Sequence, residues 1–169
     1  MACPLCLINP DSHSFTNFGK LGETHLLYTA AARVLDYKET PEKIINFKMH
    51  LDTMKGKRWI WVLDSGDMEI KHYSSMNYTR QLAQLLMKDH EETIQGIWIL
   101  RPNLWMRTTL KFLKTLFKAG LFSKVRIFEG EKLEVYIGLE KAALNGRPLQ
   151  WLGSAIALKP NQALPQVTL

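Results

Sequence analysis

Two unbroken apolar runs constrain the fold of this chain more than any other feature of its sequence. The first is residues 59–63 (WIWVL) and the second is residues 97–100 (IWIL). Each is followed by turn-forming residues, DSGD at 64–67 and RPN at 101–103. A strand with one exposed face alternates apolar and polar residues, so unbroken runs of this length indicate strands that are covered on both faces. The two runs therefore predict central strands of a mostly parallel sheet that lies between helices.

Helix-start signals follow the predicted strands. Thr40 supplies a capping hydroxyl in front of a proline and an acid, a pattern typical of the first turn of a helix. Ser74 or Ser75 is expected to open a second helix that runs to about residue 90. A third is expected to begin near Asn103 and to end at Gly120, because glycine commonly terminates helices. With further strands at 24–32 and 125–128 and a helical region at 131–145, the alternation predicts an α/β fold: a layered, mostly parallel sheet with flanking helices.

Positive charge is concentrated in one segment of the sequence. Residues 93–128 contain no acid but hold seven basic residues: Arg101, Arg107, Lys111, Lys114, Lys118, Lys124 and Arg126. The formal charge of the whole chain is +6, so the remainder sums to −1. A segment of this kind predicts a surface that faces anions.

The third predicted helix is amphipathic. Its basic residues Arg107, Lys111, Lys114 and Lys118 are spaced by four, three and four positions and form one stripe. A second stripe consists of Met106, Leu110, Leu113 and Phe117, and Trp105, Phe112 and Leu116 extend the apolar arc away from the charges. Such a helix can pack on a sheet without any ligand, and it can equally border a binding cavity.

Motifs of common enzyme classes are absent from the sequence. It contains no G-x-x-x-x-G-K-[ST], no G-x-G-x-x-G and no G-x-S-x-G. The five histidines are scattered, without a carboxylate at a metal-binding spacing. Asp64 follows a central strand, where α/β enzymes keep catalytic groups, but it is also placed to cap the turn around Gly66. We favour the turn role and expect a protein that is not an enzyme.

Composition limits the partners and the location. Nucleic acid is a disfavoured partner, because the aromatic residues lie away from the basic stripe on which bases would have to stack. The apolar runs are too short to span a bilayer, and the first residues lack the basic region of a secretory signal. Two cysteines suit a reducing compartment. We expect a cytoplasmic or peripheral membrane protein and leave open a place in a mitochondrial assembly.

Cys3 and Cys6 form a C-x-x-C pair, which is half of a zinc knuckle. A structural zinc site needs four ligands. His13 or His25 could complete it, as could another chain. We favour two free thiols and predict no metal site, with Cys3, Cys6 and His13 as weak candidates.

The order of these motifs resembles the CRAL-TRIO lipid-binding domain over about residues 26–140, and is closest to its divergent, BCH-like branch, without the N-terminal helical bundle of the carrier proteins. Three stretches carry the resemblance: WIWVLDSG at 59–66, GIWILRPN at 96–103 with the helix that follows, and SKVRIFEG at 123–130. The first is similar to the apolar strand that ends in Asp-x-x-Gly. The third is similar to the Ser-Lys-Ile-x-Phe strand entry of that family.

The resemblance implies a sheet that floors an apolar cavity, with the third helix at its mouth. It assigns Trp105, Leu110, Phe112, Leu113, Leu116 and Phe117 to the cavity or to its gate. It also implies that Lys124 approaches a lipid headgroup, with Glu92 contributing from the preceding turn. The basic residues Arg101, Arg107, Lys111, Lys114, Lys118 and Arg126 would then face an anionic surface.

Two functional hypotheses follow. In the first, residues 23–145 form a non-enzymatic lipid-binding domain with a basic rim toward anionic headgroups, phosphoinositides among them; no cofactor is expected beyond a bound phospholipid. In the second, the pocket is closed and the domain is a scaffold or accessory subunit of a larger assembly of partner proteins, either membrane-bound or not. Residues 1–22 are predicted to be an extended arm, and residues 146–169 a tail that packs Trp151 and Leu152.

Overall fold

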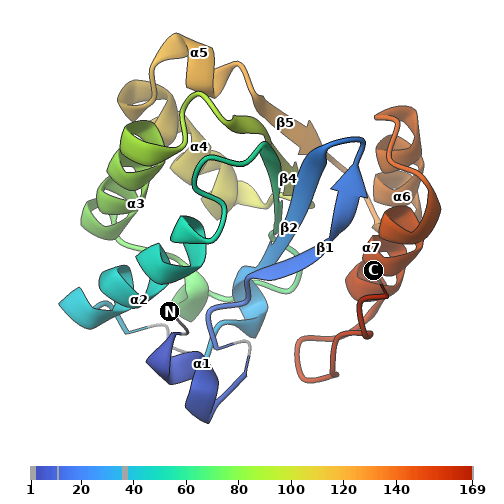
Figure 1. Cartoon of the computed structure of the whole chain (residues 1–169), viewed down its shortest axis with the longest axis horizontal. Helices are drawn as coiled ribbons and strands as arrows, with labels where there is room; N and C mark the ends of the chain where they lie inside the picture. The colour runs from blue at the N-terminus through green and yellow to red at the C-terminus, as the bar shows by residue number, and fades with distance from the viewer. Residues whose placement is uncertain (1–2, 11, 36–37, 169) are drawn as a thin grey trace.

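A computed structural model describes residues 3–10, 12–35 and 38–168, and its elements form the predicted α/β arrangement (Figure 1). The strands are β1 (Thr16–Leu21), β2 (Thr24–Ala30), β3 (Trp59–Asp64), β4 (Ile94–Leu100) and β5 (Val125–Phe128). The helices are α1 (Pro4–Ile8), α2 (Pro41–Asp52), α3 (Met76–Asp89), α4 (Leu104–Leu116), α5 (Ala119–Phe122), α6 (Lys132–Lys141) and α7 (Gly146–Ala157), with short 3-10 turns η1 (Ala31–Arg33) and η2 (Ile70–His72). None of the described helices has both the length and the apolar character needed to cross a membrane.

The sheet is mostly parallel, as predicted. Within the described residues its strand order is β1-β2-β3-β4-β5. Strands β2 to β5 run parallel to one another, and β1 pairs antiparallel with β2 at one edge. The two apolar runs lie in β3 and β4, which are the strands with parallel neighbours on both sides.

Each central strand contributes to two separate cores. Ile60 and Val62 of β3 enter one core, whereas Trp59 and Trp61 enter the other, because successive side chains of a strand point to opposite faces. Helices α6 and α7 cover the first face, and α2, α3 and α4 cover the second (Figure 1). We refer to these as the α6–α7 face and the α2–α4 face. This double coverage explains why the runs show no polar alternation.

The predicted helix starts are confirmed, but one predicted helix end is wrong. The side chains of Thr40, Ser75 and Asn103 accept backbone hydrogen bonds at the starts of α2, α3 and α4. Helix α4 ends at Leu116 rather than at Gly120, which lies inside α5. The next residue, Phe117, adopts an extended backbone while its side chain enters the core of the α2–α4 face. Tertiary packing of an aromatic ring therefore ends this helix before the glycine is reached.

Both ends of the described chain belong to the folded structure. The segment predicted to be an extended arm contains α1 and the edge strand β1. The predicted tail is helical over α7, which packs beside β1 (Figure 1). Its Trp151 and Leu152 are buried, as expected, and the ring of Trp151 stacks on Phe18 of β1 with a centroid separation of 5.1 Å. The boundaries at residues 22 and 145 stay a prediction.

Candidate functional site

An apolar cavity of about 200 Å³ lies on the α2–α4 face of the sheet. Its floor is made by strand residues Trp61, Leu63, Ile97, Ile99 and Val125. Its roof is made by helices α2, α3 and α4, and the loop between β3 and α3 lines it near the carboxyl ends of the strands. A cavity between the sheet and the helix after β4 is the arrangement that the family resemblance implied.

Helix α4 brings one predicted stripe to the cavity and directs the rest of its apolar arc elsewhere. Met106, Leu110, Leu113 and the following Phe117 all line the cavity. Three predicted gate residues lie outside the lining: Trp105 is 54% exposed, Phe112 packs its ring beneath Arg80, and Leu116 is half-buried against the core. Residues spaced by three and four positions share one helix face. Spacing alone could therefore predict which residues of the stripe lie together, but not which other apolar residues of α4 reach the cavity.

Helix α3 supplies lining residues that the sequence analysis did not assign to the cavity. Thr79, Leu82, Ala83 and Leu86 line it, again at spacings of three, one and three positions. That periodicity was visible in the sequence, but it also fits an ordinary buried helix face. The small side chain of Ala83 is buried and borders the cavity.

A buried cation lies in the cavity lining. Lys43 of α2 is only 8% exposed, and its ammonium lies 4.8 Å from the ring centroid of Tyr78. The face of an aromatic ring attracts a cation, so Tyr78 offsets part of the cost of removing this charge from water. Sequence analysis missed Lys43, because its position in α2 could be linked to the cavity only through the tertiary structure.

Two residues of the predicted basic rim are used within the fold. Lys124 Nζ donates hydrogen bonds to the carbonyl oxygens of Glu91 (2.6 Å) and Ile94 (2.8 Å). The guanidinium of Arg101 forms a largely buried ion pair with Asp64, with an N–O distance of 2.7 Å. These contacts connect β4 to the start of β5 and to the end of β3, so neither cation is directed at the cavity.

The remaining predicted headgroup residues have varied surroundings. Arg107 pairs with Glu129 (2.7 Å), Lys118 lies beyond the end of α4 and pairs with Glu91 (3.5 Å), and the guanidinium of Arg126 lies over the Phe128 ring. Glu92 is exposed. Lys111 and Lys114 are exposed on the outer side of α4, and the described residues form no ion pair with either.

Asp64 has the turn role that the sequence favoured. Its Oδ1 accepts the backbone N–H of Gly66 (2.9 Å), its Oδ2 accepts the Tyr28 hydroxyl (2.8 Å), and Arg101 donates to both oxygens. A Cβ at Gly66 would meet the guanidinium of Arg101, so a larger residue there would displace Arg101 from its position beside Asp64. Burial, together with the Asp64 carboxylate, raises the pKa of Tyr28 well above its ordinary value. The carboxylate therefore holds the ends of three strands together.

The weak metal candidates lie together. Cys3, Cys6 and His13 converge beside α2, where His50 joins them. His25, the other histidine considered as a ligand, instead contacts Asn17 in the β1–β2 hairpin.

Comparison with known families gives one match. A family model described as a divergent CRAL/TRIO domain matches residues 27–146, which run from within β2 to the end of α6 and include helices α2, α3 and α4. No curated protein matches the chain.

Proposed function

The chain belongs to the divergent CRAL/TRIO domain family, and we propose that it binds one small lipid or other single-chain apolar ligand in the cavity of the α2–α4 face. Domains of this family bind lipids or small hydrophobic ligands. The observation that carries the proposal is the apolar cavity of about 200 Å³ that lies between the sheet and helices α2 to α4.

The size of the cavity limits the ligand. An apolar cavity of about 150 Å³ accommodates benzene, whereas pockets for drug-sized ligands are about 300–1,000 Å³. A space of about 200 Å³ therefore suits part of one hydrocarbon chain. A phospholipid with two acyl chains would need α4 to move away from the sheet. We accordingly propose a single-chain ligand rather than an enclosed phospholipid.

Lys43 suggests the chemistry of the polar end. It places a buried ammonium in a lining that is mostly apolar. A ligand carboxylate beside it would form a charge-assisted hydrogen bond with the ammonium. We propose that the ligand is a fatty acid or a similar anionic amphiphile, with its charged end toward Lys43. In this proposal the anionic group of the ligand is bound by Lys43 of α2 rather than by Lys124.

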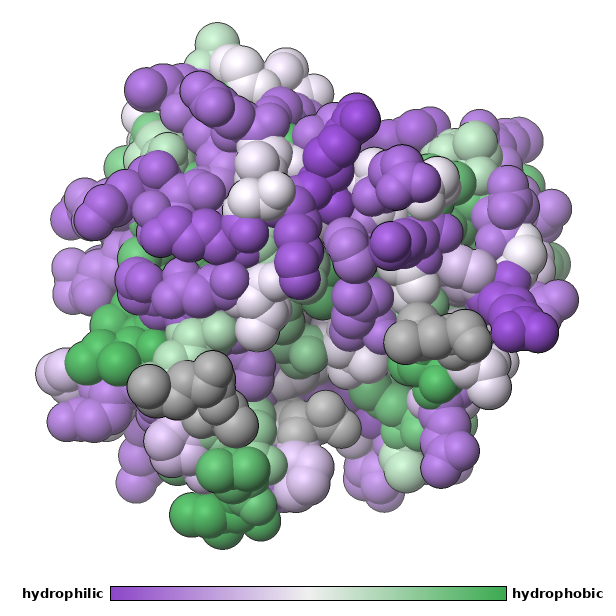
Figure 2. Space-filling model, viewed as in Figure 1, coloured by the Kyte–Doolittle hydropathy of each residue, from purple (hydrophilic) through white to green (hydrophobic). Residues whose placement is uncertain are grey.

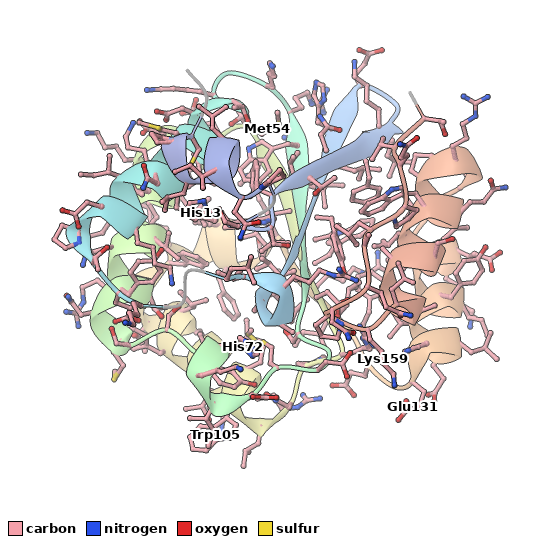
Figure 3. All side chains as sticks on the ribbon, turned by 90° about the horizontal axis from the view of Figure 1, so that it is seen from below. His13, Met54, His72, Trp105, Glu131 and Lys159 are labelled. Carbon is pink, nitrogen blue, oxygen red and sulfur yellow. The ribbon has the colours of Figure 1, made fainter. Side chains whose placement is uncertain are left out.

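The apolar surface beside the cavity supports a contact with membranes. Ile70, Leu104 and Trp105 are 76%, 74% and 54% exposed, and the Trp105 ring lies 6.2 Å from that of Tyr73, a cavity-lining residue. We call these three residues the apolar tip; Figure 3 shows Trp105 at the outer edge of the molecule, on the same side as His72. Tryptophan is favoured at membrane–water interfaces. Lys111 lies seven positions after Leu104, on the same side of α4, where it could meet anionic lipid.

The proposed role is not enzymatic. Asp64 was the candidate catalytic carboxylate, and its oxygens accept hydrogen bonds from Tyr28, Gly66 and Arg101. A carboxylate held in this way is suited to fixing strand ends rather than to transferring protons.

Two matched probes test the proposal: decanoate and decanol, titrated into the full chain by calorimetry. We expect both probes to bind the wild type. Ala83→Leu should weaken the binding of both probes at least about tenfold, because the added side chain occupies the cavity. Ala155→Leu, on the α6–α7 face, should leave both affinities unchanged. Lys43→Met should weaken the binding of decanoate by about 10- to 100-fold, which corresponds to the loss of a hydrogen bond to a charged group. The binding of decanol should be unchanged.

The outcomes separate the two parts of the proposal. If neither probe binds and solvent extraction of the natively purified chain yields no lipid, the cavity is not a binding site, and the scaffold hypothesis is favoured. If Lys43→Met affects both probes equally, the apolar site stands, and the orientation of the carboxylate is wrong.

A further inference from the structure

Four metal-ligating side chains gather where α1 meets α2. Cys3 and Cys6 flank the first turn of α1, His13 lies in the segment between α1 and β1, and His50 lies in the last turn of α2. One ligand atom from each lies within 4.8 Å of all the others. Figure 3 shows His13 in the region between α1 and α2. Three separate segments of the chain therefore meet at one point.

Four of the six distances between the ligand atoms match the edges of a tetrahedron around a zinc ion, and all six are within 4.8 Å. His13 Nδ1 lies 3.6 Å from the sulfurs of both Cys3 and Cys6, and His50 Nε2 lies 3.4 Å from the Cys6 sulfur and 3.2 Å from His13 Nδ1. With bonds of about 2.3 Å to sulfur and about 2.0–2.1 Å to nitrogen, tetrahedral zinc separates its ligands by about 3.6 Å for S···N and about 3.4 Å for N···N. Each observed separation agrees with these values to within about 0.2 Å.

Hydrogen bonding alone does not explain these contacts. His13 Nδ1 lies close to three ligand atoms, the sulfurs of Cys3 and Cys6 and Nε2 of His50. A ring nitrogen has a single in-plane site, which holds either one hydrogen or one lone pair. It can therefore form a well-directed hydrogen bond with only one of the three. A metal ion on the lone pair of this nitrogen would lie next to all three partners at once.

We propose that Cys3, Cys6, His13 and His50 form a structural Zn²⁺ site. Two sulfur and two nitrogen ligands favour zinc over harder cations such as Mg²⁺ or Ca²⁺. Four protein ligands close the coordination sphere, which is characteristic of structural rather than catalytic zinc. Two thiolates neutralise the ion, so the complex can form beside side chains as buried as Cys3 and His13, which are 6% and 1% exposed.

The site gives α1 a means of attachment that apolar packing does not provide. Helix α1 has five residues, none of them buried, and its Leu7 and Ile8 are 72% and 85% exposed. Figure 2 shows apolar surface over this part of the molecule. Isolated helices of this length are unstable in water, because nucleation is costly. A zinc ion would fix both ends of its first turn to α2 and to the segment that leads into β1.

The first test counts metal in the full chain purified without chelator. We expect inductively coupled plasma mass spectrometry to give one zinc per chain for the wild type and nearly none for Cys6→Ser or His50→Gln. The matched control is His25→Gln, which removes a histidine outside the cluster and should retain one zinc. Loss of zinc in the control to the same extent as in the ligand variants would contradict the proposal.

A second test uses the wild type alone, since a ligand variant can fail to fold. Co²⁺ added to the metal-free chain should saturate at one ion and give the visible bands of a tetrahedral site with thiolate-to-cobalt charge transfer. Removing the metal should lower the thermal midpoint by about 5 °C or more. A folded wild type that binds neither zinc nor cobalt, or that binds cobalt without thiolate bands, would overturn the proposal.

Discussion

The two faces of the sheet are built from the same strands but are filled very differently. On the α6–α7 face, aromatic rings interlock: Phe18 stacks on Trp151, and the edge of Tyr28 meets the same indole with a centroid separation of 5.4 Å. On the α2–α4 face, the sheet and three helices leave a cavity of about 200 Å³. Hydrophobic strands alone therefore do not determine whether a core is full.

Glycines on the α6–α7 face show how little space remains there. A Cβ at Gly153 would lie 2.8 Å from the Tyr136 ring, and one at Gly138 would lie 3.1 Å from Phe128. Even one added carbon would require a neighbour to shift. By contrast, the small residue Ala83 borders open space on the other face.

The unfilled face has an energetic cost. A closed void in a protein core costs about 24 cal/mol per Å³; this cavity is partly open to solvent, so its cost is below the value of about 5 kcal/mol that a closed void of about 200 Å³ would have. A bound apolar ligand would recover part of this energy, which fits the proposed function.

The largest expected effect is a difference between two alanine-to-leucine variants. Ala155→Leu on the α6–α7 face should lower the free energy of unfolding by about 1–3 kcal/mol, because it overpacks a full core. Ala83→Leu should leave that free energy unchanged or raise it, because the added atoms enter the cavity. Urea unfolding of both variants in ligand-free form measures the difference. Equal destabilisation by both would mean that the two faces are equally packed.

A smaller effect is expected at the surface. Trp105→Ser, in the apolar tip, should weaken binding to vesicles that contain anionic lipid by up to about tenfold, the equivalent of about 1.4 kcal/mol. Leu133→Ser is the matched control, because Leu133 is 70% exposed on α6, beside the packed core. Co-sedimentation with vesicles measures both. If the control loses as much binding as Trp105→Ser, the membrane contact does not belong to the α2–α4 side.

The smallest expected effect concerns pH. His90 is 1% exposed on the α2–α4 face, where its ring meets Trp59 edge-on, and burial lowers its pKa below the ordinary value. A histidine whose pKa is lowered by folding contributes stability above its unfolded pKa of about 6.5 and loses it as the pH falls through the folded value. Stability should therefore decrease on acidification below about pH 6.5.

Comparing the wild type with His90→Gln isolates this contribution, since any other titrating groups remain in both proteins. The variant should lose less stability than the wild type between neutral and mildly acidic pH in urea unfolding. Identical pH dependence of the two proteins would show that the titration of His90 does not affect stability.

Much of the architecture was predictable from local sequence. Local signals predicted the unbroken strands β3 and β4 and the helix starts at Thr40 and Asn103. Each of these signals acts over a few residues, so its effect can be predicted from the sequence. The apolar stripe of α4 was predictable for the same reason, because helical periodicity fixes which residues share a face. The ends of helices were less predictable. Helix α4 ends at Leu116, because Phe117 adopts an extended backbone, whereas the sequence predicted an end at Gly120.

The sequence by itself determined that strands covered on both faces would alternate with amphipathic helices, since periodicity and capping are local properties. Only the tertiary structure decided which face would keep a cavity, that Lys43 would line it while Lys124 bonded to backbone carbonyls, and that His50 would join Cys3, Cys6 and His13. Those outcomes depend on distances between segments far apart in the chain. Such distances are set by how side-chain volumes fill the space between elements, and no local pattern encodes them.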